Sequence, residues 1–157
     1  MSGASLAATT ATPAQTEELG ARLAARLVPG DLIALRGPLG AGKTVFVRGL
    51  AAGRGVDPAL VKSPTFVLHH VYGSPPRLHH LDLYRLGPAA DIALLDLDSL
   101  LDTAPAAVEW GDHGDLSPWN PLRLSIEIVP AGRRVEALSP DLAPERLVRA
   151  FREALDP

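Results

Sequence analysis

The stretch of this chain that most constrains its fold is glycine-rich: residues 37–44 read Gly-Pro-Leu-Gly-Ala-Gly-Lys-Thr. It fits the pattern G-x-x-x-x-G-K-[ST], in which a loop wraps around a phosphate and points successive backbone N–H groups at it. Glycine adopts the required conformations without steric cost, and the following helix presents its positive end to the same anion. We expect Lys43 to place its charge on the β- and γ-phosphates, and the Thr44 hydroxyl to ligate Mg²⁺.

The residues on either side of this loop have the pattern that a phosphate loop requires. Residues 32–35 are almost wholly apolar, as in a strand that is buried on both faces of a sheet. A helical pattern begins inside the loop and extends over 43–52. So short a pattern can match by chance in a glycine-rich chain, but this strand–loop–helix context favours a functional loop. Pro38 has no N–H, so we expect the donors to be the amides of residues 40–44.

Strand and helix patterns along the rest of the chain predict one α/β domain. Residues 1–12 lack apolar periodicity and are expected to form a flexible N-terminal tail, which leaves residues 13–157 for the domain. The mixture of strand–loop–helix units and later paired strands predicts a P-loop NTPase-like three-layer fold with a mixed, partly parallel sheet. Further helices are predicted at 19–27 (capped by Thr12 or Thr16) and 144–155, and one or two short helical turns at 91–101. Further strands are predicted at 66–71, 77–84, 106–108, 133–138 and 122–129, where Leu122, Leu124, Ile126 and Ile128 alternate with polar residues and face one way.

The composition limits the classes of protein to which the chain can belong. Its 157 residues suffice for one ordinary domain. There is no cysteine, which rules out disulfides, thiolate zinc sites and cysteine nucleophiles. A net charge of −3 argues against a globally basic surface for nucleic acid. The sequence shows neither a signal peptide nor an apolar stretch near the roughly 20 residues of a membrane span, so we expect a cytoplasmic protein.

Two carboxylates are candidates for the second protein contact that a phosphate-bound Mg²⁺ needs. Asp82 and Glu109 each follow a short apolar run, and parallel strands deliver ligand groups at their carboxyl ends. The sequence pattern does not rank them. Residues 63–66, Ser-Pro-Thr-Phe, lie between the loop helix and Asp82, where phosphate-sensing segments occur, so Thr65 is a candidate contact to the metal or the γ-phosphate.

The five histidines, at positions 69, 70, 79, 80 and 113, invite a metal-binding interpretation. Neighbouring residues on a strand point to opposite faces, so neither the 69–70 pair nor the 79–80 pair can chelate one ion. We therefore expect structural or solvent-facing roles for these side chains.

Four segments together resemble one known family in their order and spacing. They are Leu-Gly-Ala-Gly-Lys-Thr at 39–44, Ser-Pro-Thr-Phe at 63–66, His-Leu-Asp-Leu-Tyr-Arg-Leu at 80–86 and Val-Glu-Trp at 108–110. In these segments the chain is similar to the TsaE family, small P-loop ATPases required in bacteria for threonylcarbamoyladenosine formation in tRNA. The resemblance runs over residues 16–138 and includes Thr-Glu-Glu-Leu-Gly at 16–20 and Gly-Arg at 132–133.

This resemblance implies roles for individual residues. Thr44 and Glu109 would ligate Mg²⁺, and Asp82 would be the strand-end carboxylate near the metal and the attacking water. The catalytic set would be Lys43, Asp82 and Thr65. Residues that would hold ATP, with the first helix and the region of Arg133 on the adenine side, are Thr16, Leu39, Gly40, Ala41, Gly42, Lys43, Thr44, Val45 and Arg133.

The resemblance also implies roles outside the phosphate contacts. Trp110, Tyr84 and Arg85 would belong to the nucleotide pocket or to a partner contact, and apolar packing is the alternative for Trp110. Pro38 stands where the family usually has an acidic residue, from which we expect an altered loop entrance and no loss of binding.

The implied activity is that of an ATP-driven accessory protein. It would bind a TsaB–TsaD-type complex, let that complex turn over through ATP hydrolysis, and meet tRNA only through the complex, with no membrane involved. Three alternatives stay open. A P-loop kinase usually needs a basic lid, and residues 111–121 hold no arginine. A GTPase usually carries Asn-Lys-x-Asp, which is missing here, and Asp-x-x-Gly after the switch, which is missing too. A nucleotide-gated binding module would use the same carboxylates.

Overall fold

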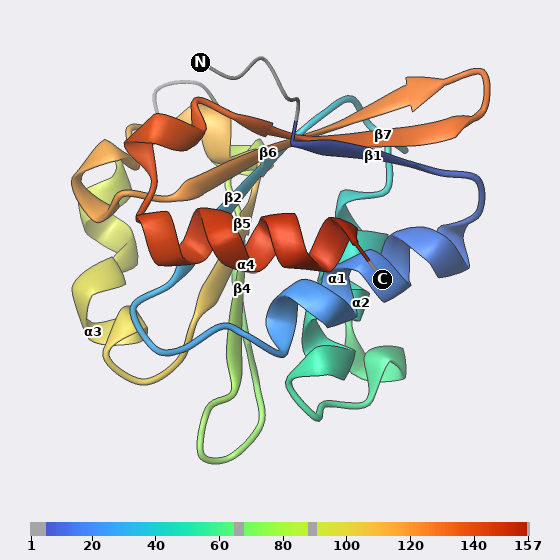
Figure 1. Ribbon diagram of the computed structural model, residues 1–157. Coiled ribbons are helices and arrows are strands. Elements are labelled where there is room, and N and C mark those ends of the chain that lie inside the picture. The colour runs from blue at the N-terminus through green and yellow to red at the C-terminus, as the bar shows by residue number, and fades with distance from the viewer. Residues whose placement is uncertain (1–5, 65–67, 88–90, 157) are drawn as a thin grey trace.

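A seven-stranded mixed sheet runs through the centre of the protein, and helices cover both of its faces (Figure 1). The computed structural model describes residues 6–64, 68–87 and 91–156. The strands are β1 Ala7–Thr10, β2 Leu32–Arg36, β3 His69–Tyr72, β4 Leu78–Asp82, β5 Ala106–Glu109, β6 Leu122–Val129 and β7 Gly132–Leu138. They lie in the order β1-β7-β6-β2-β5-β4-β3.

The four middle strands, β6, β2, β5 and β4, are parallel, whereas the pairings of β7 with β6, β1 with β7 and β3 with β4 are antiparallel. The first four residues of the central strand β2 are apolar because the strand is buried on both faces. Leu32 and Ala34 belong to the core on one face of the sheet, and Ile33 and Leu35 belong to the core on the other. The predicted three-layer α/β fold with a mixed, partly parallel sheet is confirmed.

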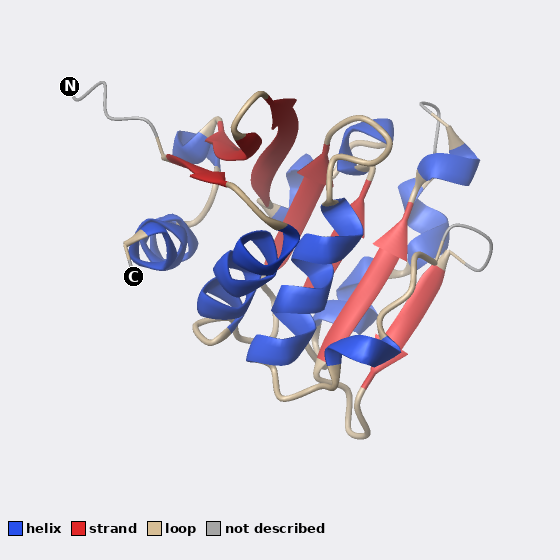
Figure 2. Ribbon diagram, turned by 90° about the vertical axis from the view of Figure 1, so that its right-hand side faces the viewer, coloured by secondary structure: helices blue, strands red, loops and turns tan. Residues whose placement is uncertain are grey.

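Three helices share the core on one face: α1 Pro13–Ala24, α2 Lys43–Gly53 and α4 Glu145–Leu155. The short helix α3, Leu97–Leu101, packs in the core on the other face. Figure 2 views the sheet from the side of α1 and α2, with the second layer behind it. Short 3₁₀ turns are η1 Pro58–Leu60, η2 Tyr84–Leu86, η3 Ile92–Leu95, η4 Gly111–His113, η5 Ser117–Trp119 and η6 Pro140–Leu142.

Helix α1 begins at the first of the two predicted caps. The Thr12 side chain accepts a hydrogen bond from the amide of Gln15, and Pro13 occupies the first turn, where a missing N–H costs nothing. Thr16 lies one turn further on, and its buried hydroxyl is 2.6 Å from that of Thr10. The structure therefore assigns the cap to Thr12.

The predicted flexible tail over residues 1–12 is wrong for Ala7–Thr10, which form the edge strand β1. This strand pairs with β7, from Ala7 opposite Glu136 to Thr10 opposite Arg133. Its four small residues show no apolar alternation, so the sequence carried no strand signal. The position of β1 is set by main-chain hydrogen bonds to β7, which lies more than 100 residues further along the sequence. A local sequence pattern cannot indicate such a partner.

The remaining predicted elements appear close to their expected positions, with two qualifications. The strand predicted at 66–71 appears as His69–Tyr72, and residues 66 and 67 lie outside the described part of the chain. Of the alternating apolar residues of β6, Leu122, Leu124 and Ile126 are buried, but Ile128 is 55% exposed. The reason is that β2 pairs with β6 only as far as Ser125, so the end of the β6–β7 hairpin extends beyond its neighbour.

Two glycines allow α1 and α2 to pack with their backbones in contact. A Cβ atom on Gly49 would lie 1.9 Å from the carbonyl oxygen of Glu17. A Cβ atom on Gly20 would lie 2.5 Å from the carbonyl oxygen of Phe46. Both distances are far below van der Waals contact, so a side chain at either position would push the helices apart.

We expect Gly49→Ala to lower the free energy of unfolding by about 1–3 kcal/mol, because α2 must move to admit the methyl group. Alanine favours the helix by about 1 kcal/mol relative to glycine, so helix propensity alone would raise the stability. A net fall in the free energy of unfolding would therefore come from the clash. Urea unfolding followed by circular dichroism measures the effect. Ala52→Ser, at an exposed position of the same helix, is the control. A Gly49→Ala protein as stable as the wild type would contradict the close contact.

Candidate functional site

The glycine-rich loop leaves the end of β2 and enters α2 at the carboxyl edge of the parallel strands. Gly40, with φ +78°, and Gly42, with φ +108°, hold backbone conformations that other residues rarely adopt. Lys43 is the first residue of α2, so the free N–H groups of the first turn lie next to the loop. Arg133 on β7 supports the loop, because its Nε donates to the carbonyl of Ala41 at 2.9 Å and its Nη2 to that of Gly40 at 3.2 Å.

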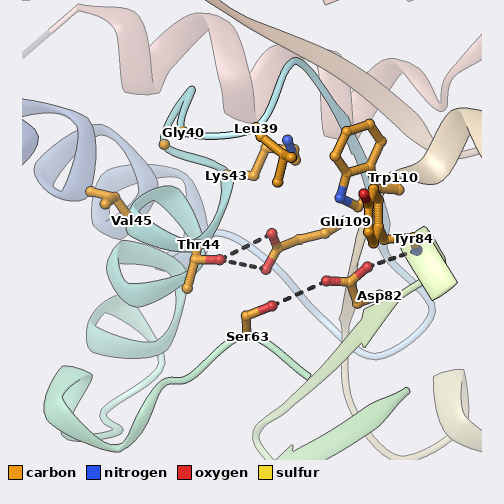
Figure 3. Close-up of a pocket in the computed structure, with 11 residues that line it drawn as sticks. Leu39, Gly40, Lys43, Thr44, Val45, Ser63, Asp82, Tyr84, Glu109 and Trp110 are labelled. Atoms are coloured by element: carbon orange, nitrogen blue, oxygen red, sulfur yellow. Dashed lines mark hydrogen bonds between the residues drawn. The ribbon is translucent and has the colours of Figure 1, made fainter. Parts of the chain in front are cut away.

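A pocket of about 380 Å³ opens beside this loop (Figure 3). Its walls come from the loop and α2, from the segment after η1, and from the ends of β4 and β5 with the residues that follow them. The lining residues are Leu39, Gly40, Gly42, Lys43, Thr44, Val45, Ser63, Asp82, Tyr84, Glu109 and Trp110. The structure thus places the two candidate carboxylates in the same cavity as Lys43 and Thr44.

The carboxylates meet because β4 and β5 are parallel and in register. Asp82 pairs with Glu109, and Glu109 pairs in turn with Leu35, two residues before the loop. Residues that are paired across neighbouring strands point to the same face of a sheet. Both carboxylates are almost fully buried, with 1% of Asp82 and 3% of Glu109 exposed.

The structure distinguishes the two carboxylates by their partners, which the sequence could not do. The Thr44 hydroxyl lies 3.0 Å from each carboxylate oxygen of Glu109. One oxygen of Asp82 accepts a hydrogen bond from the Ser63 hydroxyl at 3.2 Å, and the other accepts one from the Tyr84 amide at 2.8 Å. Glu109 is therefore the carboxylate next to the loop helix, and Asp82 is the one next to Ser63 (Figure 3).

The Lys43 ammonium lies inside the loop. It donates to the carbonyl oxygens of Gly37 at 2.6 Å and Pro38 at 2.9 Å, and it lies 4.1 Å from the centre of the Trp110 ring. Burial lowers the pKa of Lys43, while the nearby carboxylates, Glu109 foremost, act in the opposite direction. Pro38, the unusual residue of the loop, thus contributes through its carbonyl.

Trp110 follows Glu109 directly and turns its ring back over the loop. Its φ of +58° is rare for a bulky side chain and costs on the order of 1–3 kcal/mol. The ring stands 5.0 Å from that of Tyr84, and it packs at the same time against the core below α3. The apolar packing considered for Trp110 is therefore present, and the same ring also lines the pocket.

A second pocket of about 230 Å³ lies on the other side of the loop. It shares Gly40, Gly42 and Val45 with the first pocket, so the two adjoin. Thr16 and Arg133, the residues expected on the adenine side, both line it. Its full lining is Thr10, Ala11, Thr12, Pro13, Thr16, Gly40, Ala41, Gly42, Val45, Gly132 and Arg133. Residues expected in a flexible tail therefore form part of this wall.

Thr65, the predicted contact of the switch-like segment, lies outside the described residues. The residue of this segment that the structure places in the pocket is Ser63, through its hydrogen bond to Asp82. The sequence pattern places Ser63 in the 63–66 motif but indicates no role for it. Its hydroxyl, a hydrogen-bond donor close to the expected site, was the feature that could have indicated this contact.

The histidines divide between the two faces of the sheet as strand alternation requires. His69 Nε2 lies 3.0 Å from His79 Nδ1, and His79 Nε2 lies 2.7 Å from the Thr103 hydroxyl. His80 points to the opposite face, where its Nε2 lies 2.5 Å from Glu109 Oε2. Sequence reasoning missed this link to the site, although His80 stands two residues before Asp82 and so shares its face.

We expect the free energy of unfolding to fall as the pH drops from about 7 to about 5.5, in part through two histidines. Burial lowers the pKa of both His69 and His79 below the ordinary value of 6.5. The unfolded chain therefore binds more protons than the folded protein just below pH 6.5, which favours unfolding. Urea unfolding at several pH values should show a smaller fall in His79→Gln. Identical pH profiles for the two proteins would refute this explanation.

The sequence of this chain is similar to those of known proteins. The family model described as "Threonylcarbamoyl adenosine biosynthesis protein TsaE" matches residues 10–135. The chain belongs to the TsaE family. The "tRNA threonylcarbamoyladenosine biosynthesis protein TsaE" of Streptomyces coelicolor is 50% identical over 99 residues, which cover 60% of this chain and 66% of that protein. The protein of the same name from Mycobacterium tuberculosis is 40% identical over 116 residues, covering 66% of this chain and 68% of that protein.

The fold has a counterpart among solved structures. The structure entitled "Crystal structure of Bacillus subtilus YdiB" matches with a TM-score of 0.70 and 26% identity, over 94% of this chain and 92% of that chain. The resemblance to the TsaE family predicted from four short segments is confirmed. The match to the Streptomyces relative spans just under two thirds of its length. In the described part of the chain, no helix has the length and apolar character needed to cross a membrane.

Proposed function

We propose that this TsaE-family protein binds ATP and hydrolyses it slowly, as an accessory in the threonylcarbamoyladenosine modification of tRNA. The observation that carries the proposal is the meeting of Lys43, Thr44, Asp82 and Glu109 in one pocket beside a phosphate-type loop. We expect the protein to act in the cytoplasm on a TsaB–TsaD-type complex, to meet tRNA only through that complex, and to leave the transfer of the threonylcarbamoyl group to other proteins.

ATP would lie across the loop, with its phosphates in the first pocket and its adenosine in the second. The amides of residues 40–44 and the first turn of α2 would donate to the phosphates. Lys43 would exchange its loop carbonyls for phosphate oxygens, which are stronger acceptors. Thr16 and Arg133 line the second pocket, which supports an adenosine site there.

The oxygen donors of the first pocket fit Mg²⁺. This ion prefers hard oxygen ligands and usually shares its coordination between one or two protein groups, phosphates and water. Thr44 and Glu109 would hold the ion, because their oxygens already lie within 3.0 Å of each other at the start of α2. The ion supplies charge that offsets the negative charge developing on the phosphates during hydrolysis. Within the described residues, no three His, Asp or Glu side chains are grouped to hold a metal ion without other ligands.

Asp82 would orient the attacking water. Its carboxylate faces the pocket beside Glu109, and the Ser63 hydroxyl and the Tyr84 amide fix its orientation. A carboxylate held in this way accepts a hydrogen bond from water without reorganising during the reaction. Thr65 would act in the neighbouring segment as a switch-like contact.

We expect wild-type protein to release phosphate from ATP slowly in the presence of Mg²⁺, and Lys43→Ala to lower kcat/KM by at least about 100-fold. The reason is that no other lysine or arginine lines the first pocket in the part of the chain that the structure describes. Phosphate release by purified protein, with and without EDTA, measures this. The control Arg152→Ala, on the exposed side of α4, should retain wild-type turnover. Equal turnover in wild type and Lys43→Ala would contradict the assignment of the first pocket as the site of ATP hydrolysis.

We expect ATP to promote association with a purified TsaB–TsaD-type complex, since the TsaE family model matches most of the chain. A pull-down without nucleotide, with ATP and with a non-hydrolysable ATP analogue measures the association. Binding that is equally strong with ATP and the analogue, in a chain without ATPase activity, would favour the nucleotide-gated binding module. No co-elution under any of these conditions would count against the proposed partner.

A further inference from the structure

A buried chain of hydrogen bonds runs from the candidate metal ligand Glu109 to His80 on β4 and Tyr72 on β3. Glu109 Oε2 lies 2.5 Å from His80 Nε2, and His80 Nδ1 lies 2.9 Å from the Tyr72 hydroxyl. The Tyr72 hydroxyl also reaches the carbonyl oxygen of Lys62 at 3.4 Å. The chain crosses β3, β4 and β5, and it ends on the carboxylate that contacts α2.

The sheet register makes room for this contact. His80 on β4 pairs with Ala107 on β5, and Glu109 lies two residues further along the same face of β5. Ala107 carries only a methyl group, so it does not block the diagonal contact between His80 and Glu109. His80 is fully buried, so water does not compete for its ring nitrogens.

The donors and acceptors available to Tyr72, His80 and Glu109 fix the direction of the hydrogen bonds between them. An ionised carboxylate only accepts, so His80 Nε2 must carry a hydrogen and donate it to Glu109. The Tyr72 hydroxyl has one hydrogen, and His80 Nδ1 at 2.9 Å is a nearer acceptor for it than the Lys62 carbonyl at 3.4 Å, so Nδ1 accepts. This tautomer is assigned from the network, and it leaves every ring nitrogen of His80 with a partner.

The two carboxylates of the pocket have separate supports. Asp82 is held by the Ser63 hydroxyl and the Tyr84 amide, whereas Glu109 is held by Thr44 and His80. Thr44 is itself expected to ligate the ion, which leaves His80 as the support of Glu109 that lies outside the coordination sphere. Groups that hydrogen-bond a metal ligand from behind fix its orientation, and their loss typically weakens metal binding about 10–100-fold.

We propose that His80, itself oriented by Tyr72, is a positioning residue that holds the Glu109 carboxylate toward Thr44 and the Mg²⁺ ion. This inference rests on the proposed function, in which Glu109 ligates Mg²⁺ bound with ATP. It gives a function to the histidine that precedes Asp82 on the same strand face.

The test measures metal affinity in full-length protein without turnover. Mn²⁺ serves as the paramagnetic substitute for Mg²⁺, and its binding to protein saturated with a non-hydrolysable ATP analogue is followed by electron paramagnetic resonance. We expect His80→Leu to weaken Mn²⁺ binding by about tenfold or more. His80→Gln should restore most of the affinity, because the glutamine amide can donate from near the position of Nε2. Tyr72→Phe, which removes only the hydroxyl, should weaken binding by about threefold.

The matched control is His79→Leu. His79 is the neighbouring residue on β4, is 2% exposed, and faces the other side of the sheet, where it bonds Thr103. We expect His79→Leu to leave Mn²⁺ affinity unchanged. Affinity for the analogue in EDTA should be the same in all variants, since His80 does not line the pocket.

The outcomes separate this inference from the function on which it rests. If the wild type binds the analogue and Mn²⁺, and His80→Leu binds both as tightly, the positioning role is overturned while the proposed function stands. If His79→Leu loses as much Mn²⁺ affinity as His80→Leu, the effect is one of packing in β4, and the role is again overturned. If the wild type binds neither probe, the proposed function fails, and this inference fails with it. Should His80→Leu not fold, Tyr72→Phe and His80→Gln carry the same comparison.

Discussion

The parallel register of β2, β5 and β4 is the constraint on which the rest of the site depends. Leu35, Glu109 and Asp82 stand side by side on these three strands. The loop that follows β2 and the two carboxylates therefore arrive at one edge of the sheet, where the carboxyl ends of parallel strands form the usual ligand crevice. A slip of one residue in the β4–β5 pairing would break the alignment of Asp82 with Glu109 and turn the side chains of one strand to the opposite face.

This arrangement buries charge, and the structure compensates with hydrogen bonds. A buried carboxylate without partners is strongly unfavourable, so each one at this edge must find donors within the protein. Glu109 takes them from α2 and β4, and Asp82 takes them from Ser63 and from η2. Within the described residues, no buried side-chain nitrogen or oxygen lacks a partner. The same groups that satisfy the carboxylates also fix their orientation, which connects the stability of this edge to its chemistry.

The antiparallel extension of the sheet supports the other side of the loop. Arg133 on β7 donates to two loop carbonyls, and β7 in turn pairs with β1. Residues 10–12, at the junction of β1 and α1, line the second pocket together with Arg133 and the loop. The N-terminal strand is therefore part of a site wall, although its own sequence resembles that of a tail. Its position follows from main-chain pairing with residues that lie at the far end of the sequence.

The sequence by itself determined the loop, the strand and helix that flank it, and the family. Each depends on residues close together in the chain: glycines at positions that need positive φ, an apolar run buried on two faces, and a lysine followed by a hydroxyl. It also named Asp82 and Glu109 as candidates, because each ends an apolar run. Only the tertiary structure decided that Glu109 is the one beside Thr44, that Ser63 and His80 support the carboxylates, and that Ala7–Thr10 form a strand. These outcomes depend on strand register and pairing between distant segments, which no local pattern specifies.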